Sequence, residues 1–331
     1  MRFELVKPAV VDGKRIPGLY SVDLEFKRDF LRQYILVCAA ALKVAAHPHV
    51  VLDEFHESMK ETARLAVDAF RRLGAIGENI VFYHILRAAP GYHLHDALKE
   101  KGFKFREVFI RPQYVVSSYA DHTSQAIEDF RITFEDFSKL PRGKVDVFKP
   151  DTEATGRTAL VSLERLRMEC ESKDCALGKL VLYGYISENS LEEISRKADL
   201  MGFEEVVSIA LVDLPRLASN NYDMPAFGPD LALWKKEGRV KYLGSIMERR
   251  TFERMLKEYV PGMDQPGDFS ERQKLIYDGH RWTRGDVLWH LRRCEEEIRK
   301  IMEIPGCLRD FQREIAEREL NNIYKVMEDI R

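Results

Sequence analysis

The sequence predicts an α/β protein with a mostly parallel sheet that is covered by helices on both faces. Two observations support this prediction. Short apolar runs alternate with amphipathic segments between residues 79 and 212, and this strand–helix–strand rhythm is typical of a parallel sheet. The strand signal is weak before and after this region. We therefore expect N-terminal helices before the sheet and a C-terminal helical appendage after it.

The N-terminal segment, residues 1–75, is predicted to be helical and to pack on the core. Residues 24–73 look helical, and residues 58–73 repeat apolar side chains every three or four positions with charges between them. The apolar run at residues 34–46 contains Lys43 and is too short to span a bilayer. A buried helix is therefore predicted there, and no membrane partner is expected.

The central segment, residues 76–235, is predicted to form the sheet. Its expected strands lie at residues 79–86, 105–111, 144–148, 178–186 and 203–212. Its expected helices lie at residues 92–102, 158–170 and 190–202, with Ser190 as a candidate N-cap. Ligands of such sheets bind beyond the carboxyl ends of the strands, so residues that directly follow the strands are the candidates for a site.

The C-terminal segment, residues 236–331, is predicted to be the helical appendage. Helical patterns cover residues 245–260, 286–303 and 308–330, and the last of these is long and heavily charged. The sequence leaves its role open between a cap, a dimer surface and a platform for a partner.

Composition narrows the function classes. Hydrophobic residues make up 45% of the 331 residues, which is enough for a large core. The formal net charge is −2, whereas nucleic-acid-binding proteins usually have a basic surplus, so nucleic acid is not an expected partner. Five scattered cysteines without CxxC spacing, and an N-terminus without a secretory pattern, predict a reduced, cytoplasmic protein.

Two histidine pairs raise the question of a metal site: His47 with His49, and His93 with His95. Neither pair has the acidic or cysteine companions that a zinc site usually shows. Structural or solvent-facing roles are therefore expected, and no metal site made by the protein is predicted.

Residues 145–160, VDVFKPDTEATGRTAL, leave a predicted strand and enter a predicted helix. A helix begins with unpaired N–H groups and a partial positive charge, and small residues such as Ala154 and Gly156 let an anion approach them. Thr155 and Thr158 add hydroxyl donors, and Asp151 can accept hydrogen bonds from ribose hydroxyls. The segment is either a phosphate cradle or a plain turn with a threonine cap.

This segment resembles the loop that binds 5-phosphoribosyl 1-pyrophosphate (PRPP) in type I phosphoribosyltransferases, where an acidic pair leads into Ala/Gly-Thr-Gly-x-Thr. Pro150 stands where the first acid of the pair is usual. The resemblance implies that the whole loop binds PRPP, through Asp151, Thr152, Glu153, Ala154, Thr155, Gly156, Arg157 and Thr158.

Residues 84–98, HILRAAPGYHLHDAL, resemble the pyrophosphate loop of uracil phosphoribosyltransferases, with Ala89 in place of a glycine. A guanidinium that leaves a strand end beside small residues can bind a diphosphate in bidentate fashion. The resemblance therefore implies that Arg87 and Ala88 contact the pyrophosphate group. The alternative for Arg87 is a surface arginine at a turn.

Arg111 lies close to the place of the arginine that opens the flexible hood of that family, and residues 138–141, SKLP, resemble its Lys-Leu-Pro. Long loops in compact domains are commonly lids or binding loops. We expect Arg111 and much of residues 112–138 to move or become ordered when ligand binds. The alternative for Arg111 is a simple strand-end charge.

Residues 221–234, NYDMPAFGPDLALW, resemble the base-binding segment of uracil phosphoribosyltransferases, although Ala226 replaces a glycine and Pro229 replaces an aspartate. The alternative is an irregular loop that packs apolar side chains into the core. The resemblance implies base-binding roles for Tyr222, Met224, Phe227, Gly228 and Asp230.

Together these segments predict a PRPP-dependent phosphoribosyltransferase that joins a nucleobase, with uracil favoured, to ribose 5-phosphate and releases pyrophosphate. The reaction requires that the substrates are held close and the departing charge is neutralised, and the candidate catalytic residues are Arg87, Arg111 and Asp151. Mg²⁺ would arrive on PRPP, because it prefers phosphate and water oxygens to an all-protein cage.

Two function classes stay open. The first is the enzyme. The second is a non-catalytic sensor of PRPP or a nucleotide on the same fold, because the family's pattern is broken at Ala89, Pro150, Ala226 and Pro229. In both classes the partners are PRPP and a nucleobase or nucleotide, and a homodimer is expected.

Overall fold

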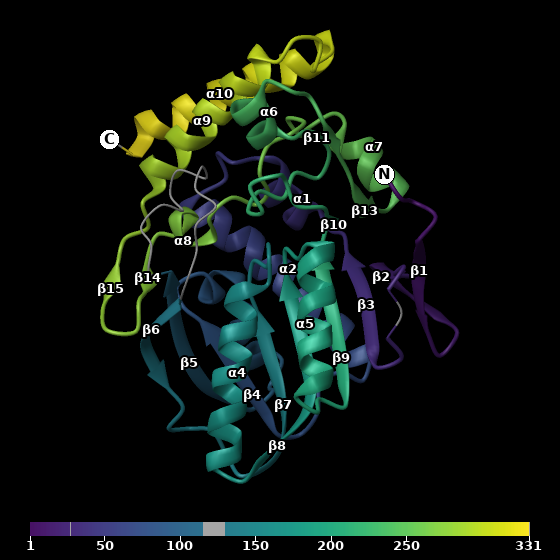
Figure 1. Cartoon of the computed structure of the whole chain (residues 1–331), viewed down its shortest axis with the longest axis vertical. Coiled ribbons are helices and arrows are strands. Elements are labelled where there is room, and N and C mark those ends of the chain that lie inside the picture. Colours follow the sequence, from purple (N-terminus) through teal and green to yellow (C-terminus); the bar gives the residue numbers. More distant parts are fainter. Residues whose placement is uncertain (27, 115–129, 331) are drawn as a thin grey trace.

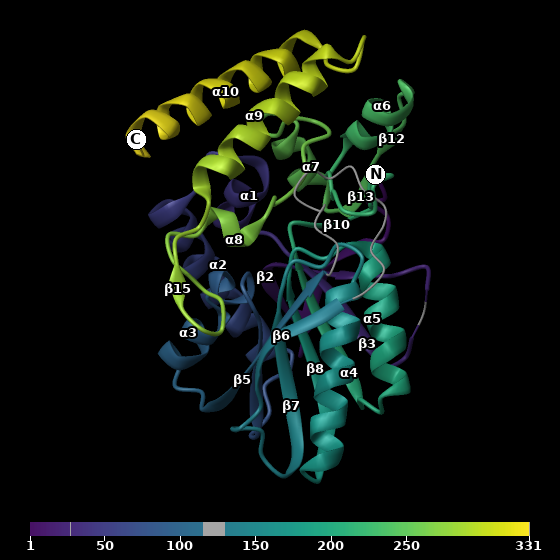
Figure 2. The same ribbon diagram turned by 60° about the vertical axis from the view of Figure 1, so that its left-hand side comes forward.

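The computed structural model describes residues 1–26, 28–114 and 130–330 (Figure 1). The described residues form a nine-stranded sheet in the order β1-β2-β3-β9-β8-β7-β4-β5-β6. Helices α4 and α5 lie on one face of the sheet and α1 and α2 on the other, as the turned view in Figure 2 shows. The mixed α/β fold with a large, mostly parallel sheet confirms the predicted fold class.

The parallel part of the sheet runs from β3 to β5. Its strands are β3 (Leu31–Leu36), β9 (Glu205–Leu211), β8 (Cys175–Gly184), β7 (Gly143–Pro150), β4 (Ile80–Ile85) and β5 (Phe105–Tyr114). Both faces of these strands are covered: on β7, Val147 packs into the core on one side of the sheet and Phe148 into the core on the other. This two-sided burial is the reason why the strands are continuous apolar runs in the sequence.

The helices that cover the sheet follow the predicted pattern. They are α1 (Ala39–Ala46), α2 (Leu52–Arg72), α3 (Leu94–Glu100), α4 (Arg157–Ser172) and α5 (Glu188–Leu200). One detail differs, because Ser187 and not Ser190 is the N-cap of α5: the Ser187 side chain accepts a hydrogen bond from the Ser190 N–H. Ser190 is instead fully buried in the first turn of the helix.

The N-terminal segment is less helical than predicted. Three strands precede α1, namely β1 (Val6–Val11), β2 (Lys14–Val22) and β3. The prediction of helix over residues 24–73 is correct for α1 and α2 and wrong for residues 31–36. The reason is tertiary, since β3 pairs in parallel with β9 and buries Ile35 and Leu36, which overrides the local preference.

The chain after β9, which includes the predicted C-terminal segment, contains helices and short strand pairs. Its helices are α6 (Leu231–Glu237), α7 (Arg249–Met255), α8 (Phe269–Arg272), α9 (Val287–Glu303) and α10 (Asp310–Ile330). Its strand pairs are β10 (Asp213–Pro215) with β13 (Ser245–Met247), β11 (Gly228–Pro229) with β12 (Tyr242–Leu243), and β14 (Ile276–Tyr277) with β15 (Trp282–Thr283). The helix predicted over residues 245–260 is therefore wrong at its start, where β13 lies.

The region predicted to be a hood is partly a strand. β6 (Phe130–Asp136) pairs antiparallel with β5 at the edge of the sheet. Residues 115–129 of the predicted hood lie outside the described residues, so its movement on ligand binding stays a prediction. In the part of the chain that the structure describes, no helix has the length and apolar character needed to cross a membrane.

Candidate functional site

Three neighbouring parallel strands end at one edge of the sheet. β4 lies between β7 and β5, with Phe82 opposite Phe148 and Ile85 opposite Ile110. If this register is continued one residue past β4, Leu86 is level with Thr152, which follows β7, and with Arg111 on β5. Arg87 follows directly after Leu86. The structure therefore brings the predicted loop and both predicted arginines to the same edge.

The 151–158 loop has the predicted strand–loop–helix form. After β7 ends, Asp151 and Glu153 continue to run beside the neighbouring chain of β8. Their N–H groups donate to the carbonyl oxygens of Tyr183 and Tyr185 at 3.0 and 2.8 Å. α4 begins at Arg157 after Gly156, which has a φ of +75°. The prediction that residues 145–160 leave a parallel strand and enter a helix is confirmed.

Gly156 is restricted by its surroundings as well as by its backbone. A Cβ at this position would lie 3.3 Å from both Cα and Cβ of Ser190 on α5. The left-handed φ adds strain for any other residue. Thr155 Oγ1 accepts a hydrogen bond from the Arg157 N–H at 3.3 Å, but the N-cap of α4 is Gly156 and not a threonine, so the alternative of a threonine cap is wrong.

The acidic residues of the loop share a buried lysine. Lys149, the residue before Pro150, is fully buried and forms ion pairs with Glu153 and, at 3.5 Å, with Asp151 Oδ2. Burial raises the pKa of Asp151 above its usual range, Lys149 opposes this shift, and Glu153 adds to it. Burial lowers the pKa of Lys149 but the two carboxylates raise it more, so the lysine stays protonated. One positive charge is thus shared between two carboxyl groups beneath the loop.

The other side chains of the loop differ in exposure. Thr152 and Ala154 are half-buried, and Thr152 Oγ1 lies 2.6 Å from the hydroxyl of Tyr92. Arg157 is exposed and Thr158 is half-buried in the first turn of α4. The loop therefore presents Thr152, Ala154 and Thr158 toward accessible space, while Glu153 faces inward to Lys149.

The two arginines are held differently. Arg87 is exposed, and its Nη2 lies 3.5 Å from Ser270 Oγ. Arg111 Nη1 donates to the carbonyl oxygen of Asp278 at 3.2 Å and lies 3.4 Å from the Asp278 carboxylate. Burial lowers the pKa of Arg111, Asp278 opposes this shift, and the positive charge of Arg87 adds to it. The two guanidinium groups are therefore within electrostatic reach of each other.

A cavity of about 150 Å³ lies on the loop. Its lining includes six residues that were predicted from the sequence to belong to the site: Ala88, Asp151, Thr152, Ala154, Tyr222 and Met224. Its other lining residues were missed: Asp264, Gln265, Gly267, Asp268 and Phe269. Cavities for whole small molecules usually have about 300–1,000 Å³, so in this conformation the space fits only part of a ligand such as PRPP.

The missed residues belong to a segment that covers the site, here called the 264–278 segment. Asp264 Oδ1 accepts the Met224 N–H at 2.8 Å, and Phe269 stacks on Tyr92 with ring centres 4.1 Å apart. Sequence reasoning placed this segment in the helical appendage. The turn-forming run DQPGD at residues 264–268 is the signal that could have marked it as a loop.

The predicted base-binding segment is divided by the structure. Tyr222 and Met224 line the cavity, whereas Phe227 packs against Phe252 and Tyr259 with ring centres 5.0 and 5.1 Å away. Phe227 thus follows the alternative in which the loop packs apolar side chains into the core.

Gly228 and Asp230 also lie outside the cavity lining. Gly228 belongs to β11 and pairs with Leu243. Asp230 caps α6 by accepting the Leu233 N–H at 3.0 Å, and it accepts the Ser219 N–H at 2.9 Å. The geometry therefore gives no support to base contacts by Phe227, Gly228 or Asp230.

Comparison with known proteins finds similarity only at the level of structure. No protein-family model matches the chain, and no curated protein matches its sequence. The chain is similar to adenine phosphoribosyltransferase from Trypanosoma brucei in complex with AMP, pyrophosphate and ribose-5-phosphate, with a TM-score of 0.34, 15% identity and coverage of 54% of this chain and 83% of that one.

Two further solved structures belong to the same group of enzymes. They are a hypoxanthine phosphoribosyltransferase from Staphylococcus aureus (TM-score 0.31, 18% identity, 46% of this chain, 74% of that one) and orotate phosphoribosyltransferase from Aeropyrum pernix (TM-score 0.29, 17% identity, 46% and 72%). Identity and TM-score are low throughout, so no residue role is transferred from these proteins. Their names give adenine, hypoxanthine and orotate and lend no support to uracil.

Proposed function

We propose that the protein binds PRPP at the edge formed by β7, β4 and β5 and transfers its phosphoribosyl group to a nucleobase, with release of pyrophosphate. The observation that supports this most directly is that the 151–158 loop, Arg87 and Arg111 lie at the same level of the neighbouring strands β7, β4 and β5. A helix N-terminus favours a phosphate group, and two guanidinium groups favour a diphosphate. One edge of the sheet thus offers a place for each charged end of PRPP.

The chemistry needs positioning and charge neutralisation more than a nucleophilic side chain. As the bond from the anomeric carbon to pyrophosphate breaks, negative charge grows on the leaving group and positive charge on the sugar. Arg87 and Arg111 would stabilise the first charge, and the amides of the α4 N-terminus would fix the 5-phosphate. The remaining rate enhancement would come from holding the base against the sugar, because two bound and oriented substrates no longer have to meet in solution.

Mg²⁺ is part of this proposal through PRPP. The carboxylates of Asp264 and Asp268 line the cavity, and oxygen donors of this kind suit Mg²⁺. Asp151 and Glu153 fit less well, because both pair with Lys149. When bound, the ion would neutralise charge on the pyrophosphate group, with Asp264 and Asp268 as the residues that could hold it.

The base remains open within this proposal. Tyr222 and Met224 share the cavity with the loop, so a base would lie against them. Uracil is the base that the sequence resemblance favours, and it stays a prediction. The 264–278 segment closes the small cavity from the other side, so we propose that this segment shifts outward when a complete substrate enters.

A second function, a non-catalytic sensor of PRPP or a nucleotide, is favoured by one observation. Lys149 holds both carboxylates of the loop in a buried cluster. A carboxylate engaged in this way is less available to the ribose hydroxyls than a free acidic pair would be. The fold would then still bind the phosphate group but contribute less to the transition state.

Incubation with PRPP, Mg²⁺ and a panel of adenine, hypoxanthine, orotate and uracil tests the proposal. Calorimetry should show PRPP binding, and one base should yield pyrophosphate. Binding without pyrophosphate from any base would select the sensor. No binding of PRPP or of any nucleoside monophosphate would contradict both functions.

A further inference from the structure

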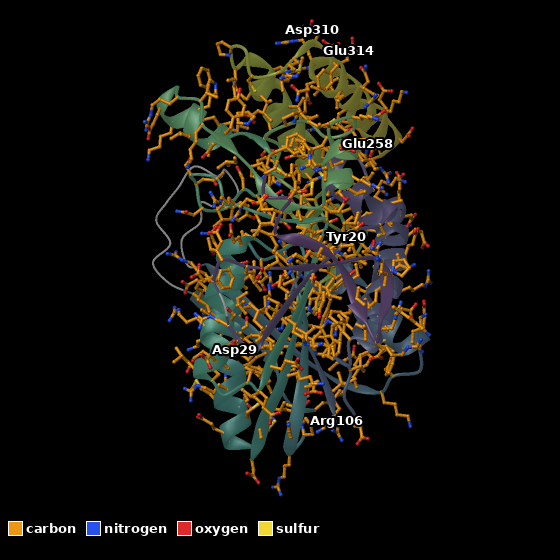
Figure 3. All side chains as sticks on the ribbon, turned by 90° about the vertical axis from the view of Figure 1, so that its right-hand side faces the viewer. Tyr20, Asp29, Arg106, Glu258, Asp310 and Glu314 are labelled. Carbon is orange, nitrogen blue, oxygen red and sulfur yellow. The ribbon has the colours of Figure 1, made fainter. Side chains whose placement is uncertain are left out.

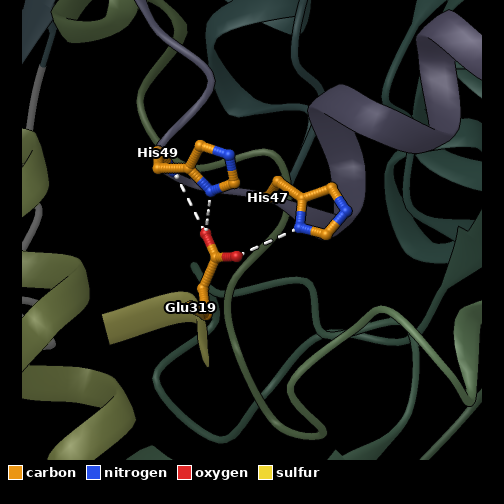
Figure 4. Close-up of side chains that lie close together, drawn as sticks. All are labelled: His47, His49 and Glu319. Atoms are coloured by element: carbon orange, nitrogen blue, oxygen red, sulfur yellow. Dashed lines mark hydrogen bonds and ion pairs between the residues drawn. The ribbon is translucent and has the colours of Figure 1, made fainter. Parts of the chain in front are cut away.

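We propose that His47, His49 and Glu319 form a binding site for a divalent transition-metal ion of the zinc class. The two histidines lie in the connection between α1 and α2, and Glu319 lies on α10 (Figure 4). The site is separate from the cavity at the 151–158 loop, and it does not depend on the function proposed above.

The three side chains already point their donor atoms at one another. His49 Nδ1 lies 2.6 Å from Glu319 Oε1, and His47 Nδ1 lies 3.1 Å from Glu319 Oε2. All the potential ligand atoms of the group lie within 4.8 Å of one another. In a tetrahedral zinc site, bonds of about 2.0–2.2 Å place neighbouring ligand atoms about 3.3 Å apart. Small side-chain rotations would therefore admit an ion between them.

The backbone that carries the histidines is fixed on both sides. The carbonyl oxygen of His47 accepts a hydrogen bond from Arg272 Nη2 at 2.8 Å, and that of Pro48 lies 3.0 Å from His290 Nε2. The fully buried Arg272 also donates to the carbonyl oxygens of Val44 and Val50. A fixed connection lowers the cost of ordering the ligands.

The carboxylate is suited to a cation. Glu319 is 3% exposed, and it also accepts the His49 N–H at 3.3 Å. Glu258 adds a second carboxylate, with its Oε2 4.0 Å from His47 Nε2. The group therefore combines two imidazoles with negative charge, the donor set that zinc and its neighbours prefer.

Solvent reaches the group through an adjacent cavity. His47, His49 and Glu258 line a cavity of about 730 Å³ together with residues of α1, α2 and α10. A site with three protein ligands leaves a position for water, and this cavity can supply it. The alternative is a purely structural contact, in which two neutral imidazoles donate N–H groups to Glu319 and no ion is needed.

Calorimetric titration of the metal-stripped protein with Zn²⁺ alone distinguishes a metal site from a purely structural contact. We expect one ion per chain and a higher Tm in its presence, because an ion that binds the folded chain stabilises it. Affinity should fall in acid, since imidazole must be deprotonated to bind metal. Co²⁺ should give the visible absorption of a tetrahedral site.

Glu319→Gln keeps the size of the side chain and removes its charge. We expect it to lower Zn²⁺ affinity by more than the about 10–100-fold that is typical of losing a second-layer partner. His56→Asn is the matched control, because His56 Nδ1 contacts His93 Nε2 at 2.8 Å in another part of the chain. This control should bind Zn²⁺ as the unchanged protein does.

Three results would overturn the proposal. The first is no stoichiometric Zn²⁺ binding by the unchanged protein, a measurement that needs no variant. The second is a Zn²⁺ affinity in Glu319→Gln, or in His47→Gln if that variant alone folds, that equals the affinity of the unchanged protein. The third is loss of binding in His56→Asn, which would place the ion at the other histidine pair.

Discussion

The 151–158 loop and the 264–278 segment line the same cavity but are held in place by different means. The loop continues β7 along the sheet: the Asp151 and Glu153 N–H groups still bond to Tyr183 and Tyr185, and Gly156 then turns the chain into α4. The segment is fixed by distant partners, since Asp264 bonds Met224 and Arg272 bonds carbonyl oxygens near α1. The loop is thus a continuous motif, and the segment is assembled by the fold.

This difference separates two contributions to binding. A loop that presents backbone amides at a helix N-terminus recognises a phosphate group whatever is attached to it. A segment that closes over Tyr222 and Met224 decides how much space the rest of the ligand has. We therefore expect a change that displaces the loop backbone to abolish binding, side-chain changes in the loop to weaken it, and changes in the segment to adjust affinity among ligands.

The largest effect is expected at Gly156. Gly156→Leu should abolish PRPP binding, because its Cβ would meet Ser190 at 3.3 Å and a larger side chain would push the loop backbone away from α5. Gly202→Leu is the matched control, since Gly202 has a similar φ of +80° with open space around it. Calorimetry measures the PRPP affinity of both variants, and we expect binding by Gly202→Leu and none by Gly156→Leu. PRPP affinity that is unchanged in a folded Gly156→Leu protein would show that the phosphate binds elsewhere.

Arg87 should matter more for turnover than for binding, because the charge that it faces grows as pyrophosphate departs. Arg87→Ala is expected to lower kcat by about a hundredfold or more, the scale for losing one preorganised donor. Arg106→Ala should leave kcat unchanged, since Arg106 is exposed near the start of β5, at the far end of the molecule from α10 (Figure 3). Robust turnover by Arg87→Ala would mean that the pyrophosphate site is misplaced.

Asp151 should have an intermediate effect that depends on pH. Asp151→Asn is expected to weaken PRPP binding by about tenfold or more, the scale of a hydrogen bond to a charged group. Burial raises the pKa of Asp151 above its usual range near 4, so the carboxylate is lost on acidification earlier than an exposed one. Affinity of the unchanged protein should therefore fall more steeply from pH 8 to pH 6 than that of Asp151→Asn. Parallel pH profiles would remove Asp151 from the site.

The 264–278 segment should respond more weakly. Asp264→Ala removes the carboxylate that accepts the Met224 N–H, so affinity for nucleoside monophosphates should change by about tenfold, the lower end of the scale for a hydrogen bond to a charged group. Inorganic phosphate, which needs only the loop, should bind as before. Asp310→Ala, an exposed position at the start of α10, is the control. If Asp264→Ala lost as much affinity for inorganic phosphate as for the nucleotide, the loop and the segment would not make separate contributions to binding.

The smallest effect is expected at Thr155. Its hydroxyl accepts a hydrogen bond from the Arg157 N–H, and backbone amides are expected to supply most phosphate contacts. Thr155→Ala should weaken PRPP binding by only a few-fold, within the range of one hydrogen bond. A loss as large as that of Gly156→Leu would show that the side chain, and not the backbone, holds the phosphate.

The same contrast explains what the sequence could predict. The parallel strands were predictable because strands that are buried on both faces appear as apolar runs in the sequence. The 151–158 loop was predictable because the start of a helix has a short local sequence pattern. β3 was mistaken for helix because its strand form depends on pairing with β9. The DQPGD run was not connected to the site because its neighbours in space, Met224 and Tyr92, are distant in sequence.

Charge pairs show the same limit. Lys149 sits within an ordinary strand pattern, and only the fold shows that it is fully buried between Asp151 and Glu153. His47 and His49 have no acidic neighbour in the sequence, yet the fold brings Glu319 to both of them. A pattern read along the chain detects ligands that are close in sequence and misses those that tertiary packing brings together.

Pyrophosphate release is the most direct test of the proposed phosphoribosyl transfer. The unchanged protein should release pyrophosphate from PRPP and Mg²⁺ in the presence of one of adenine, hypoxanthine, orotate and uracil, and the Gly156→Leu protein should release none. Release that is independent of any base, or equal in the two proteins, would contradict phosphoribosyl transfer at the 151–158 loop.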